Sequence, residues 1–201
     1  MTPGHDSLML HAVLTGLFAF VATNIDDLFV LTMFFSQTGR GPGRGRVIAG
    51  QYLGFNALLA VSMVGFFGGR VLPREWMGCL GLAPVWIGVR RWMVRNKPAT
   101  SPSPGTVSIA SVAAVTVANG GDNIGIYTPI FANCDVAQLL VMLVMFQFLL
   151  ALWCLVAHAI GRHPAVMPIL TRYGHIIVPF VLIGLGIEII FESGSLALLG
   201  F

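Results

Sequence analysis

Long apolar stretches, separated by short polar segments, dominate the hydropathy pattern of the chain. A helix needs about 20 mainly apolar residues to cross the hydrocarbon core of a bilayer. Six stretches meet this requirement and predict membrane-spanning helices at residues 8–36, 47–67, 77–94, 107–131, 136–160 and 176–198. The first stretch is longer than one crossing needs, which predicts a tilt or a break near Asn24. We therefore expect an all-α integral membrane protein.

One hydrophilic segment divides the six predicted spans into two sets of three. Residues 95–106 are rich in Pro and Ser, a composition typical of a linker. We expect a first three-helix repeat at residues 1–94, a cytoplasmic linker at 95–106 and a second three-helix repeat at 107–201, together forming a single membrane domain. Because three is an odd number, the two repeats must have opposite orientations in the membrane.

A comparison of the two halves favours an inverted repeat. An offset of 96 residues places Asp26 on Asp122 and Gln51 on Gln147. The total number of identities at this offset is no more than chance supplies. However, polar residues inside apolar spans are few, and two kinds of them coincide here. We expect a 3+3 inverted repeat, typical of transporters with a site near the bilayer midplane, with spans one and four interrupted at their polar motifs.

The charge pattern supports a membrane location and sets the expected orientation. Only 9% of the residues are charged, against about 25% in soluble domains. Nine of the eleven Lys and Arg residues follow spans one, three and five. Because cytoplasmic loops carry the excess of positive charge, we expect a multi-pass protein of the cell (inner) membrane with both termini outside. No basic segment or small-residue cleavage site indicates a cleaved signal peptide, and no basic patch with interleaved aromatic residues indicates nucleic-acid binding.

Two polar clusters interrupt the apolar spans, "TNIDD" in the first and "ANGGDN" in the fourth. On a helix, Thr23 and Asp27 share one face because they are four residues apart. Asp26 lies about 100° around the helix from Asp27, so the two carboxylates point in different directions. In the fourth span, Gly120 and Gly121 allow the backbone to open. Irregular backbone at this depth is tolerated only where it lines a cavity or is buried in protein.

The carboxylates in these clusters predict a cation site. An Asp at the centre of a spanning helix costs about 2.5–3.5 kcal/mol, and three of them about 8–10 kcal/mol if they act independently. No Lys or Arg lies within these two spans, so a bound cation or protons must neutralise the charge. Carboxylate and amide oxygens suit a divalent ion. The candidate ligands are Asp26, Asp27, Asp122, Asn123, Asn24 and Asn119. The alternative is that both clusters are hydrogen-bonded contacts between helices.

Other polar residues are secondary candidates for the same site: Thr23, Gln51, Gln147 and Glu188. The two glutamines are expected to hydrogen-bond across helices, although either could contribute a carbonyl oxygen. Glu188, in the last span, is either a ligand on the release side or a proton acceptor. The cysteines form no CxxC pair, so we expect buried thiols at Cys79, Cys134 and Cys154 in place of metal ligands.

Two motifs, "FVATNIDDLFVLTMFF" (20–35) and "TVANGGDNIGIYTPIF" (116–131), resemble those of the cadmium resistance transporter family of the lysine-exporter superfamily. The segments at 81–92 and 179–194 support the resemblance, which covers essentially all six spans. It implies export of a divalent heavy metal, Cd²⁺ above all, with Asp26, Asp27, Asp122 and Asn123 at the motif positions. The chain departs from the family at Glu188, where a neutral residue, often Tyr, is expected, and this affects the local charge and the ion preference.

Several functional alternatives are open. No ATP-binding GxxxxGK[ST] loop is present, and an inside-negative voltage opposes cation exit by about 2.3 kcal/mol per charge per 100 mV, so we expect proton-coupled alternating access. The oxygen ligands alone would prefer Mn²⁺ or Ca²⁺, and related exporters carry amino acids. A Mg²⁺-dependent membrane enzyme is a remote alternative, because "DDLFV" has no second acidic residue one turn on. We expect that the protein is not an enzyme and needs no cofactor. Its expected partners are the lipid bilayer and divalent metal ions, and homo-oligomerisation stays open.

Overall fold

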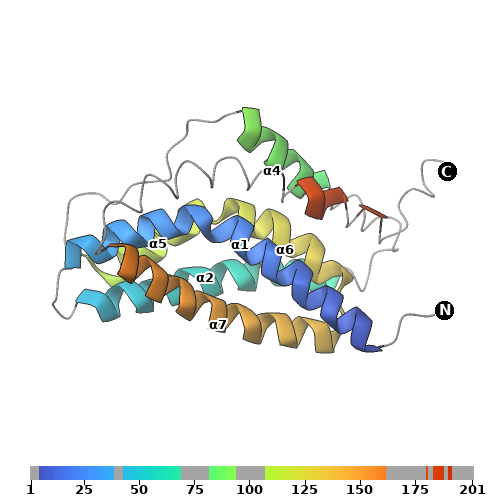
Figure 1. The fold of residues 1–201 in the computed structure, drawn as a ribbon, viewed down its shortest axis with the longest axis horizontal. Helices are drawn as coiled ribbons and strands as arrows, with labels where there is room; N and C mark the ends of the chain where they lie inside the picture. The colour runs from blue at the N-terminus through green and yellow to red at the C-terminus, as the bar shows by residue number, and fades with distance from the viewer. Residues whose placement is uncertain are drawn as a thin grey trace.

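A computed structural model describes residues 5–38, 43–68, 82–93 and 107–161, together with 180, 183–187 and 190–191. Within these ranges every regular element is an α-helix, which confirms the all-α prediction for this part of the chain. The helices are α1 (His5–Thr38), α2 (Gly43–Gly68), α4 (Leu82–Met93), α5 (Ile109–Asn119), α6 (Gly121–Asn133) and α7 (Val136–Ile160). Figure 1 shows α1, α2, α5, α6 and α7 side by side in one bundle, with α4 along one edge.

Three of these helices are long and apolar enough to cross a membrane: α1, α2 and α7. They confirm the predicted spans one, two and five. Helix α4 covers most of predicted span three, and α5 and α6 together cover predicted span four. Most of predicted span six lies outside the described residues. The six-helix 3+3 arrangement therefore stays a prediction.

The prediction that span one is interrupted near Asn24 is wrong. Helix α1 runs without a break for 34 residues. Its polar side chains bond back to the preceding turn: the Thr23 hydroxyl lies 3.0 Å from the carbonyl oxygen of Ala19, and the Asn24 amide nitrogen lies 2.8 Å from that of Phe20. Such bonds satisfy the Thr23 hydroxyl and one N–H of Asn24 without opening the helix. No Gly or Pro follows Gly16 in α1, so the backbone has no residue that would end the helix.

Span four, in contrast, is interrupted where the polar motif predicted a break. Helix α5 ends at Asn119, and α6 begins at Gly121. Gly120 lies between them with φ −80° and ψ 19°, and its N–H donates to the carbonyl of Thr116. A side chain on Gly120 would collide with Leu58 of α2. The absence of a Cβ atom at Gly120 thus lets the Leu58 side chain pack directly against the break.

The described helices pack in two sets. Helix α2 packs along both α5 and α6, whereas α1 packs mainly along α7, and α1 has fewer contacts with α2, α5 and α6. Glycines of α2 allow the close approach in the first set, because a Cβ at Gly50, Gly54 or Gly65 would meet Val112, Thr116 or Thr128. Small residues play this role in many membrane proteins. We call these sets the α1–α7 pair and the α2–α5–α6 group.

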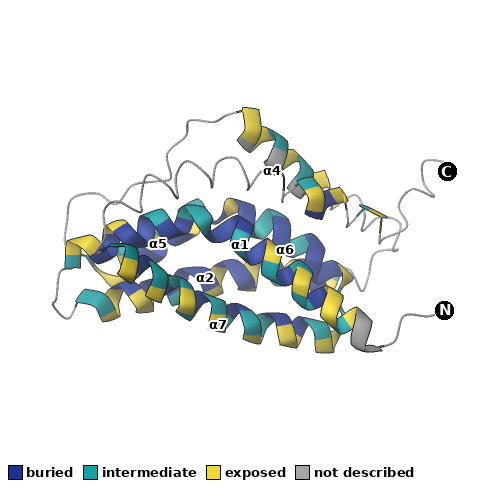
Figure 2. Ribbon diagram, viewed as in Figure 1, coloured by how far each residue is buried: buried dark blue, intermediate teal, exposed yellow. Residues whose placement is uncertain are grey.

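Aromatic rings fill the space between the two sets. Tyr127 lies 4.9 Å, centroid to centroid, from Phe146 of α7, and Phe20 of α1 lies 5.6 Å from Phe55 of α2. These rings are almost entirely buried. Figure 2 shows buried positions on the inward sides of the helices and exposed ones outside. The exposed side includes large apolar residues such as Phe148 (73% exposed), as expected for a surface that faces lipid.

Candidate functional site

Buried polar side chains gather where α1 meets α2, α5 and α6. Seven polar or charged residues of these helices, each at most 9% exposed, make up this set. They are Thr23, Asn24, Asp27, Gln51, Thr116, Asp122 and Asn123. We call them the polar cluster. All but Thr116 were singled out from the sequence.

Asp27 is held from outside its own helix by Gln51. The side-chain nitrogen of Gln51 donates to Asp27 Oδ2 at 3.4 Å, and the side-chain oxygen of Gln51 accepts from the Thr116 hydroxyl at 2.5 Å. The nitrogen end of the Gln51 amide thus faces Asp27, and its oxygen end faces Thr116. A donated N–H favours the charged form of a carboxylate. This chain of hydrogen bonds joins α1, α2 and α5.

A second set of hydrogen bonds joins α1 to α6. The Tyr127 hydroxyl lies 2.7 Å from Thr23 Oγ1 and accepts from Asn24 Nδ2 at 3.0 Å. From α7, the Trp153 indole N–H donates to the backbone carbonyl of Asn24 at 2.7 Å. Asn24 is therefore fixed by three helices. Its side-chain oxygen has no hydrogen-bond partner among the described residues.

The break before α6 places Asp122 and Asn123 in the first turn of a helix. Asp122 Oδ1 accepts from the backbone N–H of Asn123 at 3.0 Å. The N-terminus of a helix favours negative charge, so the break stabilises this carboxylate. Asn123 is fully buried, and neither its Oδ1 nor its Nδ2 has a partner in the described part of the chain. An unsatisfied buried polar group costs about 1–3 kcal/mol, so both side-chain atoms of Asn123 are candidates for a further interaction.

The helix register brings the two motifs to the same level. Helices α1 and α6 run in opposite directions (Figure 1) and touch where Thr23 meets Tyr127. Four residues further along α1 is Asp27, and four residues back along α6 is Asn123. Each step is about 6 Å along the helix axis, so Asp27 and Asn123 lie at one level.

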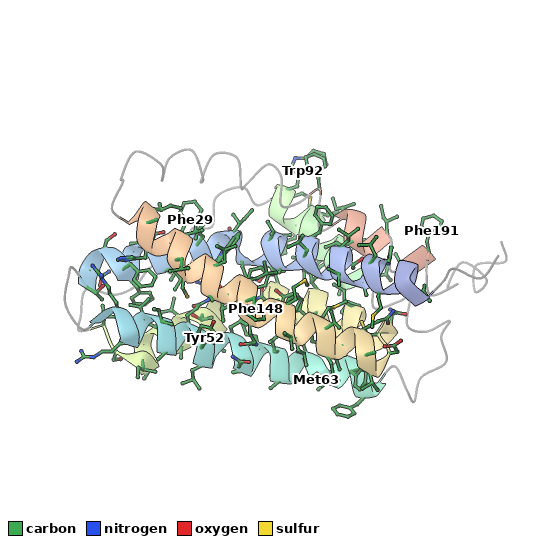
Figure 3. All side chains as sticks on the ribbon, turned by 60° about the horizontal axis from the view of Figure 1, so that its bottom comes forward. Phe29, Tyr52, Met63, Trp92, Phe148 and Phe191 are labelled. Carbon is green, nitrogen blue, oxygen red and sulfur yellow. The ribbon has the colours of Figure 1, made fainter. Side chains whose placement is uncertain are left out.

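The remaining predicted residues lie at the edge of the polar cluster or away from it. Asp26 and Asn119 are half-buried. Gln147 forms a reciprocal amide pair with Asn56, at 3.1 and 3.3 Å, on the outside of the bundle. In Figure 3, Tyr52 and Phe148 mark this side, and the Tyr52 hydroxyl donates to the Gln147 carbonyl. Gln147 is thus a contact between α2 and α7 and not part of the polar cluster, while Glu188 lies outside the described residues.

Neither cysteines nor a cluster of carboxylates forms a metal centre in the part of the chain that is described. There, no group of three or more His, Cys, Asp or Glu side chains lies close enough to hold a metal. Cys154 is buried, as predicted, Cys134 is half-buried, and Cys79 falls outside the described ranges. The polar cluster instead combines two carboxylates with amide oxygens. Such an oxygen set is suited to a divalent cation.

Sequence reasoning missed Thr116, Tyr127 and Trp153. Tyr127 follows Asn123 by four residues, so its place on the same face of α6 was a usable signal. Thr116 lies four residues before Gly120, so it is one helical turn before the break. Trp153 has no such signal, because its contact with α1 depends on how α7 packs.

Comparison with known families identifies the chain. A family model described as cadmium resistance transporter matches residues 20–200. The match takes in both polar motifs and every described helix except the first part of α1. Neither curated proteins nor solved structures include a match to the chain. With almost its whole length matched and with apolar helices of membrane-spanning length, this membrane protein belongs to the cadmium resistance transporter family.

Proposed function

We propose that this protein exports a divalent metal ion, Cd²⁺ in the first place, and that the polar cluster binds the ion on its way. The ligands would be the carboxylates of Asp27 and Asp122 and the side-chain oxygens of Asn24 and Asn123. The observation that carries the proposal is the pair of fully buried asparagines whose oxygens have no partner among the described residues, beside two buried carboxylates.

The charge balance supports a dication as the bound species. Two carboxylates in a membrane interior cost about 5–7 kcal/mol on insertion scales. Helices α1, α5, α6 and α7 contain no Lys or Arg, so neither of these residue types neutralises the carboxylates from within these helices. The N–H of Gln51 and the start of α6 stabilise the charges only in part. A single divalent ion would balance both carboxylates at once.

Asp26 and Asn119 would contact the ion before it enters the polar cluster or after it leaves. Both are half-buried, and Asn119 is the last residue of α5, directly before the break. We assign them to the path by which the ion reaches or leaves the polar cluster. Glu188, which lies outside the described residues, would be either a ligand on the release side or a proton acceptor.

Alternating access fits the way in which the helices pack. The first helix of each half packs along the second helix of the other half: α1 on α7, and α5–α6 on α2. A two-fold axis that relates the halves would produce this exchange, which supports a 3+3 inverted repeat. The polar cluster joins the α1–α7 pair to the α2–α5–α6 group. A movement of one set against the other would therefore open the cluster to one side of the membrane and then to the other.

Proton exchange would supply the driving force. With the termini outside, as the positive charges of the loops indicate, export moves two charges against an inside-negative voltage. Protons that neutralise Asp27 and Asp122 would allow the empty site to return. In vesicles with a clamped pH on each side, we expect metal transport to follow the imposed proton gradient. Transport at the same rate without a gradient would exclude this coupling.

The choice of ion is a separate question for experiment. The four proposed ligands are all oxygen atoms, and such ligands suit Mn²⁺ or Ca²⁺ better than Cd²⁺, which is a softer ion. The family assignment favours Cd²⁺. Competition among these ions and Zn²⁺ for binding to the purified protein would rank them.

Charge-removing substitutions test the site itself. We expect Asp27→Asn and Asp122→Asn each to abolish Cd²⁺ tolerance in cells and to raise their Cd²⁺ content, because each removes half of the negative charge in the cluster. The matched control is Asp135→Asn, at the N-cap of α7, where the side chain accepts from the Gln138 backbone N–H. Asn caps a helix as well as Asp does, so this variant should behave like the unaltered protein. Full tolerance in both cluster variants at equal protein levels would refute the site.

A further inference from the structure

Tyr127 stands beside the proposed ligands and is not itself one of them. It is fully buried. Its ring is packed against Phe55 of α2, Phe131 of α6 and Phe146 of α7. Its hydroxyl contacts Thr23 and Asn24 of α1. The ring is therefore packed against both sets of helices, while the hydroxyl links α6 to α1.

The hydrogen atoms around Asn24 can all be assigned. A backbone carbonyl only accepts, so the Asn24 atom 2.8 Å from the Phe20 oxygen must be the amide nitrogen. The second hydrogen of that nitrogen points to the Tyr127 and Thr23 oxygens, both at 3.0 Å. The Thr23 hydroxyl donates to the Ala19 carbonyl at 3.0 Å, so Thr23 accepts the hydrogen of Tyr127. Every donor is used, and the side-chain oxygen of Asn24 is left over.

We propose that Tyr127 is a positioning residue that keeps this oxygen turned toward the metal ion. The inference rests on the proposed function and assigns a new role within the same site. A carboxamide has nearly the same shape in both orientations, and hydrogen bonds alone decide which end faces the ion. The turned-over amide would present N–H groups to a dication. By accepting one N–H of Asn24, Tyr127 opposes that orientation and also holds α1 in register with α6.

The first test compares two tyrosines. Tyr127→Phe removes one oxygen and keeps the ring, so the aromatic packing stays intact. We expect Cd²⁺ binding to the purified full-length protein to weaken about 10-fold, the value of one buried hydrogen bond. Tyr52→Phe is the matched control: its hydroxyl bonds to the Gln147 carbonyl on the outside of the bundle, and binding should change less than 2-fold. Unchanged binding in Tyr127→Phe would overturn the proposal.

The second test separates positioning from packing. In Asn24→Asp both terminal atoms are oxygens, so no orientation has to be enforced. Tyr127→Phe should then cost less than 2-fold when added to Asn24→Asp, against about 10-fold in the native background. Equal losses in the two backgrounds would mean that the hydroxyl only supports the fold, and would overturn the inference. If Asn24→Asp itself binds no Cd²⁺, Asn24→Ala replaces it, because a positioning residue has nothing to position there.

Failure of the inference is distinguishable from failure of the proposed site. Asp27→Asn, measured in the same assay, reports on the site alone. If Asp27→Asn abolishes Cd²⁺ binding while Tyr127→Phe does not alter it, the site stands and the role of Tyr127 is refuted. If neither substitution alters binding, the site itself is wrong and the inference falls with it.

Discussion

The close packing of α2 on α6 predicts that one methyl group at Gly65 destabilises the protein. An ideal Cβ at this position would lie 2.7 Å from the carbonyl carbon of Thr128 and 2.9 Å from its Cα atom. The Thr128 carbonyl oxygen would lie closer still. Carbon atoms prefer separations of about 3.5–4.0 Å, so the helices would have to move apart by roughly 1 Å or more. The obstacle is backbone and cannot be avoided by a side-chain rotation. Pro129 also restricts the backbone of Thr128.

The expected magnitude follows from the general cost of overpacking. An added methyl group in a close-packed interior costs about 1–3 kcal/mol. For a chain of this size, each kcal/mol lowers the melting temperature by about 2–4 °C, so the loss is about 2–12 °C. Alanine also favours a helix over glycine by up to about 1 kcal/mol. A Gly→Ala substitution at a second glycine of the same helix therefore serves as the control.

That control is Gly68→Ala. No described residue lies within 4 Å of a Cβ at Gly68, the last residue of α2, so this variant adds a methyl group without a collision with the described helices. Thermal unfolding of both variants in detergent measures the difference. We expect Gly65→Ala to melt about 2–12 °C below Gly68→Ala and to bind Cd²⁺ more weakly, because Thr128 follows Tyr127 directly. Equal melting temperatures would refute the close contact between α2 and α6, and with it the α2–α5–α6 group as a rigid unit.

Two further predictions concern the contacts between the helix sets. Gln51→Leu should weaken Cd²⁺ binding at least about 10-fold, because Asp27 loses a hydrogen-bond donor and Thr116 loses an acceptor. The control is Gln147→Leu, at the corresponding position of the second half on the outside of the bundle, which should change binding less than 2-fold. Equal effects of the two substitutions would contradict the role of Gln51. A short reducible cross-link between cysteines at positions Asn56 and Gln147, in a chain whose native cysteines are replaced by alanine, should stop vesicle transport by tying α2 to α7. Reduction should restore transport, and full transport in the linked protein would exclude relative movement of the two sets.

Hydropathy predicted the described spans well because a membrane-spanning helix needs a sufficient length of apolar residues. That length can be read directly from one amino-acid sequence. Helices α1, α2 and α7 match their predictions for this reason. The break near Asn24 was predicted wrongly because a polar motif can either open a helix or fold its side chains back onto it. Thr23 and Asn24 do the latter. At Gly120 the predicted break is present, and the Leu58 side chain packs into the space that a Cβ atom would occupy.

The residue types of the polar cluster were predictable, but their geometry was not. A buried carboxylate or carboxamide is evident in an apolar stretch, so Asp27, Asp122 and Asn123 could be named from the sequence. Which of two adjacent aspartates faces inward depends on the rotation of α1, and packing against α7 sets that rotation. Tyr127 escaped notice because an aromatic residue in a spanning helix is ordinarily apolar packing. Its hydroxyl is recognisable as a site component only once α1 lies opposite it.

The two halves contribute to the cluster in different ways, although their motifs align. At an offset of 96 residues Asp122 corresponds to Asp26, yet the buried carboxylate of α1 is Asp27. In the continuous α1, Thr23, Asn24 and Asp27 lie on one side of the helix while Asp26 lies about 100° away from Asp27. At the same offset Asn123 corresponds to Asp27, and both side chains are buried. The second half differs in that Asp122, in the first turn after the break at Gly120, is buried as well. The two motifs thus share one buried position, and the second adds a buried carboxylate beside it.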